Sequence, residues 1–411
     1  MSKIGCMKKS MPLPAYIKNA IRRLNDAGFE AYVVGGAVRS WLLGTEIHDF
    51  DITSNALPAE IKEVFSDYRT IDTGIRHGTV TVLDHKNPIE VTTYRTENGY
   101  SDHRHPDEVH FTRSLQEDCA RRDFTINALC YHPKEGIRDF FGGRQDLQNF
   151  LIRAVGKPAV RFDEDALRIL RAIRFAAQLG FHIEDVTREA MLEKAETLRF
   201  VSQERITSEF TRTIAAPYAK SVLAEYRMIF ELLIPELQEY SDSTWNEMCM
   251  MMSRCPGDVN LRTAVLLDSL HDVARSDEIL RRLKYSNSDR YAVTNYLSVS
   301  DMPLSNRVEM RKAMNRLTVP VSSFLYFRCA KDPSLNREEL EALCTSIRRS
   351  GDCYTLKQLE VTGKDLKEIG LKGSRISMSM NALLNAVMED KIPNTREDLM
   401  RYLRELTGTV Q

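Results

Sequence analysis

The chain lacks most features that mark a specialised class of protein. No uninterrupted apolar stretch in its 411 residues approaches the roughly 18 residues that predict a membrane span. The basic N-terminus is followed by no apolar core, so no signal peptide is expected. A net charge of −1 gives no general sign of a nucleic-acid binder, although a whole-chain sum can hide a local basic stripe. We expect a cytoplasmic protein that needs no membrane.

Cysteine pairing of the zinc-binding kind is also missing. The eight cysteines are scattered, and none forms a Cys-X-X-Cys pair. This spacing argues against a structural zinc site and, in a chain of this length, against a disulfide framework. We expect reduced thiols, several of them packed in the interior.

What the chain does contain is the composition of an ordinary soluble protein, with 43% hydrophobic and 28% charged residues. Up to about residue 149, strand-like and helical patterns alternate. Beyond that point β-branched runs almost vanish and helical periodicity dominates. The fold class we predict is α+β, with a mixed-sheet head followed by an all-helical extension. The first helices expected in that extension cover 160–179, 187–197, 203–213 and 219–234.

Two aspartates, Asp49 and Asp51, form the most informative pattern. If they lie on a strand, their side chains share one face, where the two carboxylates repel each other unless divalent cations neutralise them. Upstream, a strand-like stretch ends in Gly35 and Gly36, and glycines that open a helix let backbone N–H groups approach a phosphate. The combination predicts phosphoryl or nucleotidyl transfer.

Glu90 is a candidate third carboxylate. It lies in a predicted strand, 89–94, whose hairpin partner is 79–83. A carboxylate from a neighbouring strand could hold a second metal ion and position an attacking oxygen. The alternative is a solvent-facing glutamate on an edge strand. The polar segment 98–111 that follows shows little periodicity, and we expect it to be a mobile loop.

A second polar segment, RRDFTINA, lies where we expect a helix over 115–131. Asp123 and Asn127 are four residues apart and would share one face of that helix. Arg122 could bind phosphate, while the aspartate and asparagine could bind ribose hydroxyls. The alternative is an aspartate that only caps a helix.

The third segment combines charge with an apolar helix. At 100° per residue, a single helix over 161–175 would carry its charged side chains in one narrow stripe, which suggests a lined cleft. A solvated helix face is the alternative. The stripe consists of Glu164, Asp165, Arg168, Arg171 and Arg174.

Together these segments resemble the class II tRNA nucleotidyltransferases, the CCA-adding enzymes of bacterial type, in the DNA polymerase β-like superfamily. GGAVR and the paired aspartates match the first family motif, and TGIRHGTVTV leads into the strand of the third carboxylate. RRDFTINA matches the second motif, and EDALRILRAIRF matches the nucleotide-recognition helix. Ser40 stands where the family usually has aspartate, and we expect changed hydrogen bonding there without loss of activity.

The resemblance implies a nucleotidyltransferase head over 1–149, a base-recognising neck over 150–216, a body over 217–310 and a tRNA-binding tail over 311–411. It implies two Mg²⁺ ions, the substrates ATP and CTP, and a tRNA gripped along its acceptor stem and elbow, with no nucleic-acid template. No membrane and no obligatory protein partner are implied. In this scheme Asp49, Asp51 and Glu90 are the catalytic metal ligands, and Gly35, Gly36 and Arg39 hold the triphosphate. Arg171 and Arg174 make further contacts with nucleotide or RNA.

Base choice follows from the edges that the bases present. Cytosine and adenine each place an amino donor beside a ring acceptor, whereas uracil and guanine place a carbonyl beside a ring N–H. A carboxylate beside a guanidinium therefore accepts the first two and rejects the others. Asp165 and Arg168 would supply this pair, with Glu164 holding the guanidinium. Each opposed contact costs ~1–3 kcal/mol, roughly a factor of 10–100.

Other functions stay open at this point. A poly(A) polymerase of the same superfamily shares the head motifs, and an enzyme that adds only the terminal A is not excluded. His271 and Asp272 could suggest a metal-dependent phosphohydrolase, but no histidine lies between His182 and His271 to supply an upstream ligand. An inactive RNA-binding protein would be expected to lack a head carboxylate, and none is lost.

Overall fold

The structure, a computed structural model, describes residues 10–72, 74–98 and 108–407. The chain divides into two compact units, Met1–Leu233 and Ile234–Gln411. The division falls within the range predicted for the body, so the four predicted domain ranges stay a prediction. In the described residues no helix is both long and apolar enough to cross a membrane.

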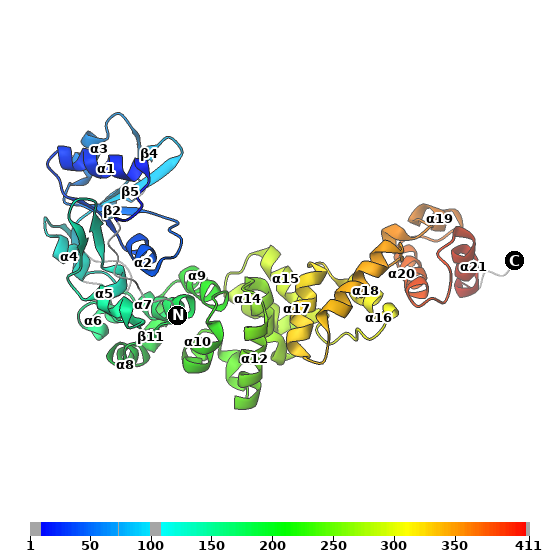
Figure 1. Ribbon diagram of the computed structural model, residues 1–411. Coiled ribbons are helices and arrows are strands. Elements are labelled where there is room, and N and C mark those ends of the chain that lie inside the picture. The colour runs from blue at the N-terminus through cyan, green and yellow to red at the C-terminus, as the bar shows by residue number, and fades with distance from the viewer. Residues whose placement is uncertain (1–9, 73, 99–107, 408–411) are drawn as a thin grey trace. The chain divides into compact units, whose positions relative to one another are not determined.

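The first unit is built on a seven-stranded mixed sheet in the order β3-β4-β5-β2-β1-β8-β9. Figure 1 labels three of these strands, β2, β4 and β5. β2 and β5 run parallel, and the other neighbours are antiparallel. The strands are β1 (Ala31–Val34), β2 (Asp51–Ser54), β3 (Arg69–Ile71), β4 (Thr79–Asp84), β5 (Asn87–Thr93), β8 (Cys130–His132) and β9 (Gly136–Arg138). The mixed-sheet head is confirmed.

Buried β-branched side chains explain why these segments form the central strands. Val33, Val80, Val82 and Val91 are fully buried, as expected where a pleated surface is covered by helices. Helices α1 (Ala15–Asp26) and α3 (Pro58–Val64) pack against each other and against the sheet. The proline at the first position of α3 confirms the predicted helix start.

A tight turn joins β1 to helix α2 (Gly36–Leu43). Gly35, between them, has φ +73°, a left-handed conformation that disfavours any residue with a Cβ. Its N–H donates to the carbonyl of Leu129 (3.1 Å), which turns the chain away from β2. The sequence therefore needs glycine here for the turn, and α2 begins at the following residue.

The predicted loop 98–111 is only partly a loop. Strands β6 (Arg95–Asn98) and β7 (Glu108–Phe111) pair in antiparallel register, so the ends of the segment are strand. Residues 99–107 lie outside the described residues, and the prediction of a loop there is not tested.

The helix predicted over 115–131 begins where expected but is wrong beyond Ala120. Helix α4 (Leu115–Ala120) ends early, a short 3₁₀ turn (Thr125–Asn127) follows, and the chain then enters β8. The N–H of Thr125 donates to the carbonyl of Arg153 (2.9 Å), and Phe124 bridges to Ala154. Pairing with a distant segment overrides the local helical pattern, an effect that periodicity within 115–131 does not reveal.

The segment predicted as one helix over 160–179 consists of two. Helix α6 (Pro158–Glu164) ends at Asp165, whose backbone is extended, and α7 (Leu167–Leu179) follows. The Asp165 carboxylate accepts the N–H of Leu167 (3.1 Å), which stabilises the break. The range 219–234 is likewise divided, into α10 (Ala219–Glu225) and α11 (Arg227–Leu233).

The remaining elements of the first unit are helical apart from the short strands β10 (Leu151–Ile152) and β11 (His182–Ile183). α7 packs against α9, and ten of its thirteen residues are buried. These remaining helices are α5 (Gly143–Gln148), α8 (Asp185–Glu193) and α9 (Gln203–Ile214).

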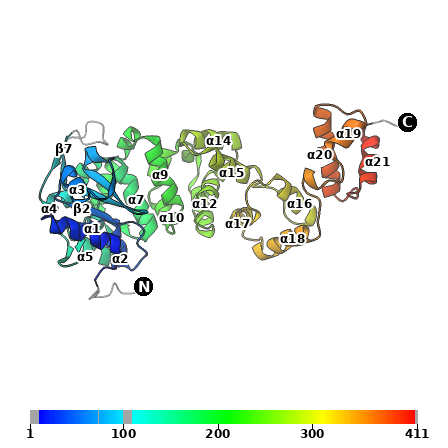
Figure 2. The same ribbon diagram turned by 90° about the horizontal axis from the view of Figure 1, so that it is seen from above.

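The second unit is helical throughout its described residues, as predicted (Figure 2). Its last helices enclose a small apolar core of their own around Leu366, Leu383 and Leu399. The helices are α12 (Asp242–Arg254), α13 (Val259–Leu267), α14 (Val273–Arg282), α15 (Asn287–Ser298), α16 (Arg307–Arg316), α17 (Val321–Lys331), α18 (Arg337–Arg349), α19 (Gly363–Glu368), α20 (Ser374–Met388) and α21 (Arg396–Thr407).

Candidate active site

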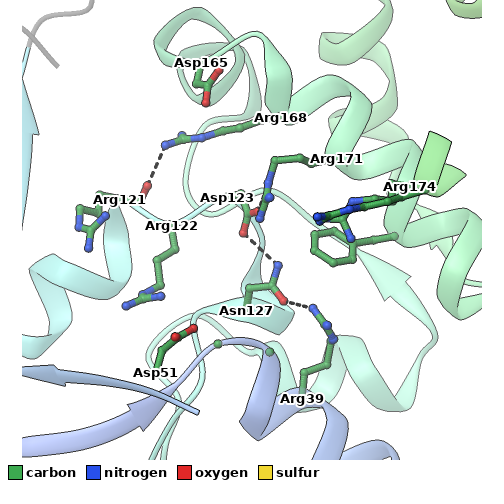
Figure 3. A pocket seen from close by; sticks show the side chains of 14 residues that line it. Arg39, Asp51, Arg121, Arg122, Asp123, Asn127, Asp165, Arg168, Arg171 and Arg174 are labelled. Atoms are coloured by element: carbon green, nitrogen blue, oxygen red, sulfur yellow. Dashed lines mark hydrogen bonds and ion pairs between the residues drawn. The ribbon is translucent and has the colours of Figure 1, made fainter. Parts of the chain in front are cut away.

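A cavity of about 550 Å³ in the first unit brings together the three predicted motifs. Seven arginines and three aspartates line it, so its walls carry an excess of positive charge. Side chains of the GGAVR and Asp51 segments approach from one side, and those of α7 from the other (Figure 3). Of the predicted site residues, the lining contains Gly35, Gly36, Arg39, Asp51, Arg122, Asp123, Asn127, Asp165, Arg168, Arg171 and Arg174.

Three predicted site residues lie outside that lining: Asp49, Glu90 and Glu164. Glu90 is nevertheless the direct neighbour of Asp51, because β2 and β5 pair in parallel with these two residues opposite each other. Opposite residues of adjacent strands project their side chains to the same face. The sheet therefore brings two carboxylates together at the edge of the cavity.

Asp49 does not share a strand with Asp51, so the predicted strand face is wrong for it. β2 begins at Asp51, opposite the last residue of β1, Val34. β1 ends at Val34, because the N–H of Gly35 donates to Leu129. No residue of β1 therefore pairs with the residues that precede Asp51. Asp49 is exposed in the segment just before the strand.

The pKa of the Asp51 carboxyl is raised above its usual value. Burial raises its pKa, and the charges of Glu90 and Asp49 raise it further, while Arg122 opposes the shift. Asp51 is reached by solvent through the open cavity, yet protein surrounds most of it, which accounts for the desolvation. In the part of the chain that the structure describes, no three His, Cys, Asp or Glu side chains form a ready-made metal site.

Arg39, on α2, lines the cavity beside the glycine turn. Its Nη1 donates to the amide oxygen of Asn127, and its guanidinium carbon lies over the ring of Phe175, 4.8 Å from the ring centre. Burial lowers the pKa of Arg39 to about 10, against the attraction of Asp123, so the group stays charged at neutral pH. Its position beside the glycine turn suits a phosphate ligand.

Asp123 and Asn127 are in contact, although not through the predicted helix. The amide nitrogen of Asn127 donates to Asp123 (3.0 Å) across a 3₁₀ turn, and the guanidinium of Arg171 donates twice to the other carboxylate oxygen (2.9 and 2.6 Å). Burial raises the pKa of Asp123, but Arg171 and the asparagine outweigh it and lower the pKa to about 2. The carboxylate is therefore a permanent acceptor.

A buried carboxylate that sequence reasoning missed, Asp118, organises the arginines of this segment. It is 0% exposed and accepts hydrogen bonds from Arg121 (3.0 and 2.8 Å), Arg122 (3.1 Å) and the hydroxyl of Thr53 on β2. The two arginines keep the pKa of Asp118 below its usual range despite burial. An acidic residue three positions before a pair of arginines was the signal available in the sequence.

Arg168 forms the predicted ion pair with Glu164. Its Nη1 lies 2.7 Å from the carboxylate oxygen Oε2. Its other terminal nitrogen donates to the backbone carbonyl of Arg121 (3.0 Å), and the residue is only 8% exposed. Burial raises the pKa of Glu164, opposed by the neighbouring guanidinium. This ion pair spans the break at Asp165, so the stripe predicted for one helix is assembled from two.

Asp165 has a partner that the sequence analysis did not name. Arg205, on α9, donates to both oxygens of its carboxylate (3.3 and 2.8 Å). Four residues later Glu209 pairs with Arg174 (2.5 Å), and three residues after that Arg212 lines the cavity. These α9 residues are four and three positions apart, so they share one face of the helix. That spacing was the signal available in the sequence.

Three family models match consecutive parts of the chain. A Poly A polymerase head domain matches residues 31–153, a probable RNA- and SrmB-binding site of polymerase A matches 180–241, and a putative tRNA nucleotidyltransferase domain 2 matches 260–403. The fold and the site are thus those of a nucleotidyltransferase.

Curated proteins are similar over nearly the whole chain. The CCA-adding enzyme of Lactobacillus helveticus (strain DPC 4571) is 35% identical over 97% of each chain. That of Streptococcus thermophilus (strain CNRZ 1066) is 35% identical over 96% of this chain and 98% of its own. The crystal structure of the Bacillus stearothermophilus CCA-adding enzyme in complex with CTP has a TM-score of 0.79 at 30% identity, covering 96% and 97%. This chain belongs to the class II CCA-adding enzyme family and is a tRNA nucleotidyltransferase.

Proposed function

We propose that the enzyme adds C, C and A to the 3′ end of tRNA from CTP and ATP, releasing pyrophosphate. The observation that carries this is an arginine-lined cavity in which the glycine turn, the Asp51 edge and the Asp165–Arg168 wall meet. The names of its full-length relatives support the same reaction.

Asp51 and Glu90 are proposed to hold Mg²⁺, with Asp49 as the third carboxylate. The fit rests on two hard oxygen donors in register, and the pKa of Asp51 is raised first by burial and then by the neighbouring charges of Glu90 and Asp49. Bound there, two such ions would activate the attacking 3′-hydroxyl and neutralise charge on the phosphates. Without cations the same carboxylates would repel a triphosphate.

The triphosphate is proposed to lie between the glycine turn and the arginines. The free backbone N–H groups at the start of α2 would bind the phosphates, and Arg39 and Arg122 line the cavity beside Gly35 and Gly36. Arg122 keeps its charge, because the buried Asp118 holds its pKa above the usual value in spite of desolvation. These residues bind and orient the α-phosphate for in-line attack.

The sugar and base are proposed to contact the opposite wall. Asp123 and Asn127 would accept and donate to ribose hydroxyls. Asp165 would accept the amino group of C or A, and Arg168 would donate to the ring nitrogen. Oδ2 of Asp165 has a lone pair beyond the one used by Arg205, and Nη2 of Arg168 has a second N–H beyond the one donated to the carbonyl of Arg121.

The helical regions are proposed to bind tRNA, with the neck, body and tail over 150–216, 217–310 and 311–411. The match of residues 180–241 to a probable RNA-binding site and of 260–403 to a tRNA nucleotidyltransferase domain supports this.

The test is addition to tRNAs ending before CCA, after C and after CC, with one nucleotide at a time. The proposal expects CTP to extend the first two and ATP to extend the third. Addition of A alone, to the tRNA ending in CC only, would replace the proposal with an A-adding enzyme. Long A tracts on any RNA would indicate a poly(A) polymerase.

A further inference from the structure

One aromatic ring in the cavity is surrounded by cations. Phe175, on α7, is 4% exposed and lines the cavity. The guanidinium carbons of Arg39, Arg171 and Arg174 lie 4.8, 5.5 and 4.1 Å from its ring centre. Each distance is within the ~6 Å over which the negative face of a ring attracts a cation. Three like charges gathered around one ring indicate a site for a polyanion.

Two of these arginines have carboxylate partners, and the third does not. Arg171 pairs with Asp123 (2.6 Å), and Arg174 with Glu209 (2.5 Å). Among the described residues, Arg39 forms no ion pair; it has the amide oxygen of Asn127 and a buried Nε without a partner. Besides the hydrogen bond to Asn127, the contact with the Phe175 ring is therefore what holds the guanidinium of Arg39 in position.

The kind of support matters for ligand binding. A carboxylate would occupy the N–H groups of a guanidinium, which point outward in its plane. A ring instead contacts the flat face of the guanidinium and leaves the in-plane donors free. Contact with the ring can thus hold Arg39 in place while Nη2 and the second N–H of Nη1 remain available to an anion.

We propose that Phe175 is a positioning residue that holds the guanidinium of Arg39 against the cavity wall for the triphosphate of the incoming nucleotide. This rests on the proposed function for the identity of the ligand. Arg174 stacks on the same ring and adds charge to the site, while Glu209 keeps it in place. The triphosphate is common to all nucleotides, so loss of the ring should weaken the binding of every nucleotide to the same extent.

The experiment measures binding of inorganic tripolyphosphate to the full chain by calorimetry, without metal. F175L keeps the apolar bulk and removes the ring face, and F175Y keeps the face. F210L is the matched control, because Phe210 is equally buried (2% exposed) and its ring packs on Phe230. We expect F175L to bind about tenfold more weakly, F175Y within about twofold of the parent, and F210L unchanged. Equal affinity of F175L and the parent would overturn the proposal, as would failure of F175Y to restore binding.

A double-mutant cycle separates positioning from loss of packing. If Phe175 acts through Arg39, R39A and the double variant R39A/F175L bind tripolyphosphate almost equally weakly. Independent, additive losses would contradict that role. Melting temperatures of F175L and F210L, measured alongside, should fall by similar amounts, since each loses one buried ring.

The result is distinguishable from failure of the proposed function. Tripolyphosphate binding needs no turnover, so a parent protein that binds the anion but adds neither C nor A would refute CCA addition and leave the role of Phe175 standing. If the parent adds C and A while F175L binds tripolyphosphate normally, CCA addition stands and the role of Phe175 is refuted.

Discussion

Arg205 donates to both carboxylate oxygens of Asp165 across the space between α9 and the break that precedes α7. The two residues are 40 apart in sequence. A two-point contact of this kind fixes the plane of a carboxylate as well as its position. It orients the side chain that we propose as the acceptor for the amino group of C or A.

Replacing Arg205 by Ala should relax base choice, because Asp165 would no longer be held in one plane. We expect roughly tenfold weaker discrimination against UTP and GTP, the scale of one opposed hydrogen bond. R188A, which breaks an exposed ion pair with Asp185 on α8, is the control. Steady-state incorporation of all four nucleotides is the measurement. A uniform loss with unchanged preference would assign Arg205 a purely structural role.

D165A and R168A should each slow addition of C and A and admit UTP and GTP, by about 10- to 100-fold in relative terms. The double variant should lose little more than either single one, since both side chains act on one base edge. Single-nucleotide incorporation measures this. If every variant keeps full preference for C and A, base choice lies elsewhere.

D51N should reduce nucleotide addition by about 10²–10³-fold or more, the scale of losing one group that stabilises transition-state charge. It should not lower stability at neutral pH. The folded-state pKa of Asp51 is raised, so its ionised form opposes folding once the pH exceeds the unfolded value near 3.8. Turnover and Tm at pH 7 are the measurements, with D84N at the end of β4 as control. Near-normal turnover of D51N with Mg²⁺ would refute the metal assignment.

D123N should destabilise the protein in a pH-dependent way. The pKa of Asp123 is lowered to about 2, so the ionised form contributes stability above the unfolded value near 3.8 and loses it as the pH falls toward 2. The expected cost is about 2 kcal/mol at pH 7 and close to zero near pH 2. Urea midpoints across this range test it. A cost that does not change with pH would point to lost packing instead.

Removing residues 100–106 should leave C addition and impair A addition. The strand that precedes them is tied to the cavity, because Glu97 pairs with Arg121 (3.2 Å), which lines it. The segment could thus reshape the pocket between steps. Rates with tRNAs ending after C and after CC distinguish the two additions. Equal loss of both would indicate destabilisation only.

Local patterns predicted much of the head. The strand that ends at Val34, the glycine turn, the proline-started helix α3 and the hairpin carrying Glu90 follow from alternation, φ preferences and turn composition. These features depend on neighbours a few residues away. The same local rules failed within 115–131, where the helix ends at Ala120 and residues 124–125 pair with 153–154.

The sequence by itself determined which residue types are available and in what order: the glycine turn, the acidic pair, RRDFTINA and the charged stripe. Only the tertiary structure decided their partners. It set Asp51 opposite Glu90, left Asp49 before the strand, and joined Asp165 to Arg205. Strand register and contacts between helices depend on packing between segments far apart in the chain, and a single sequence carries no direct record of those distances.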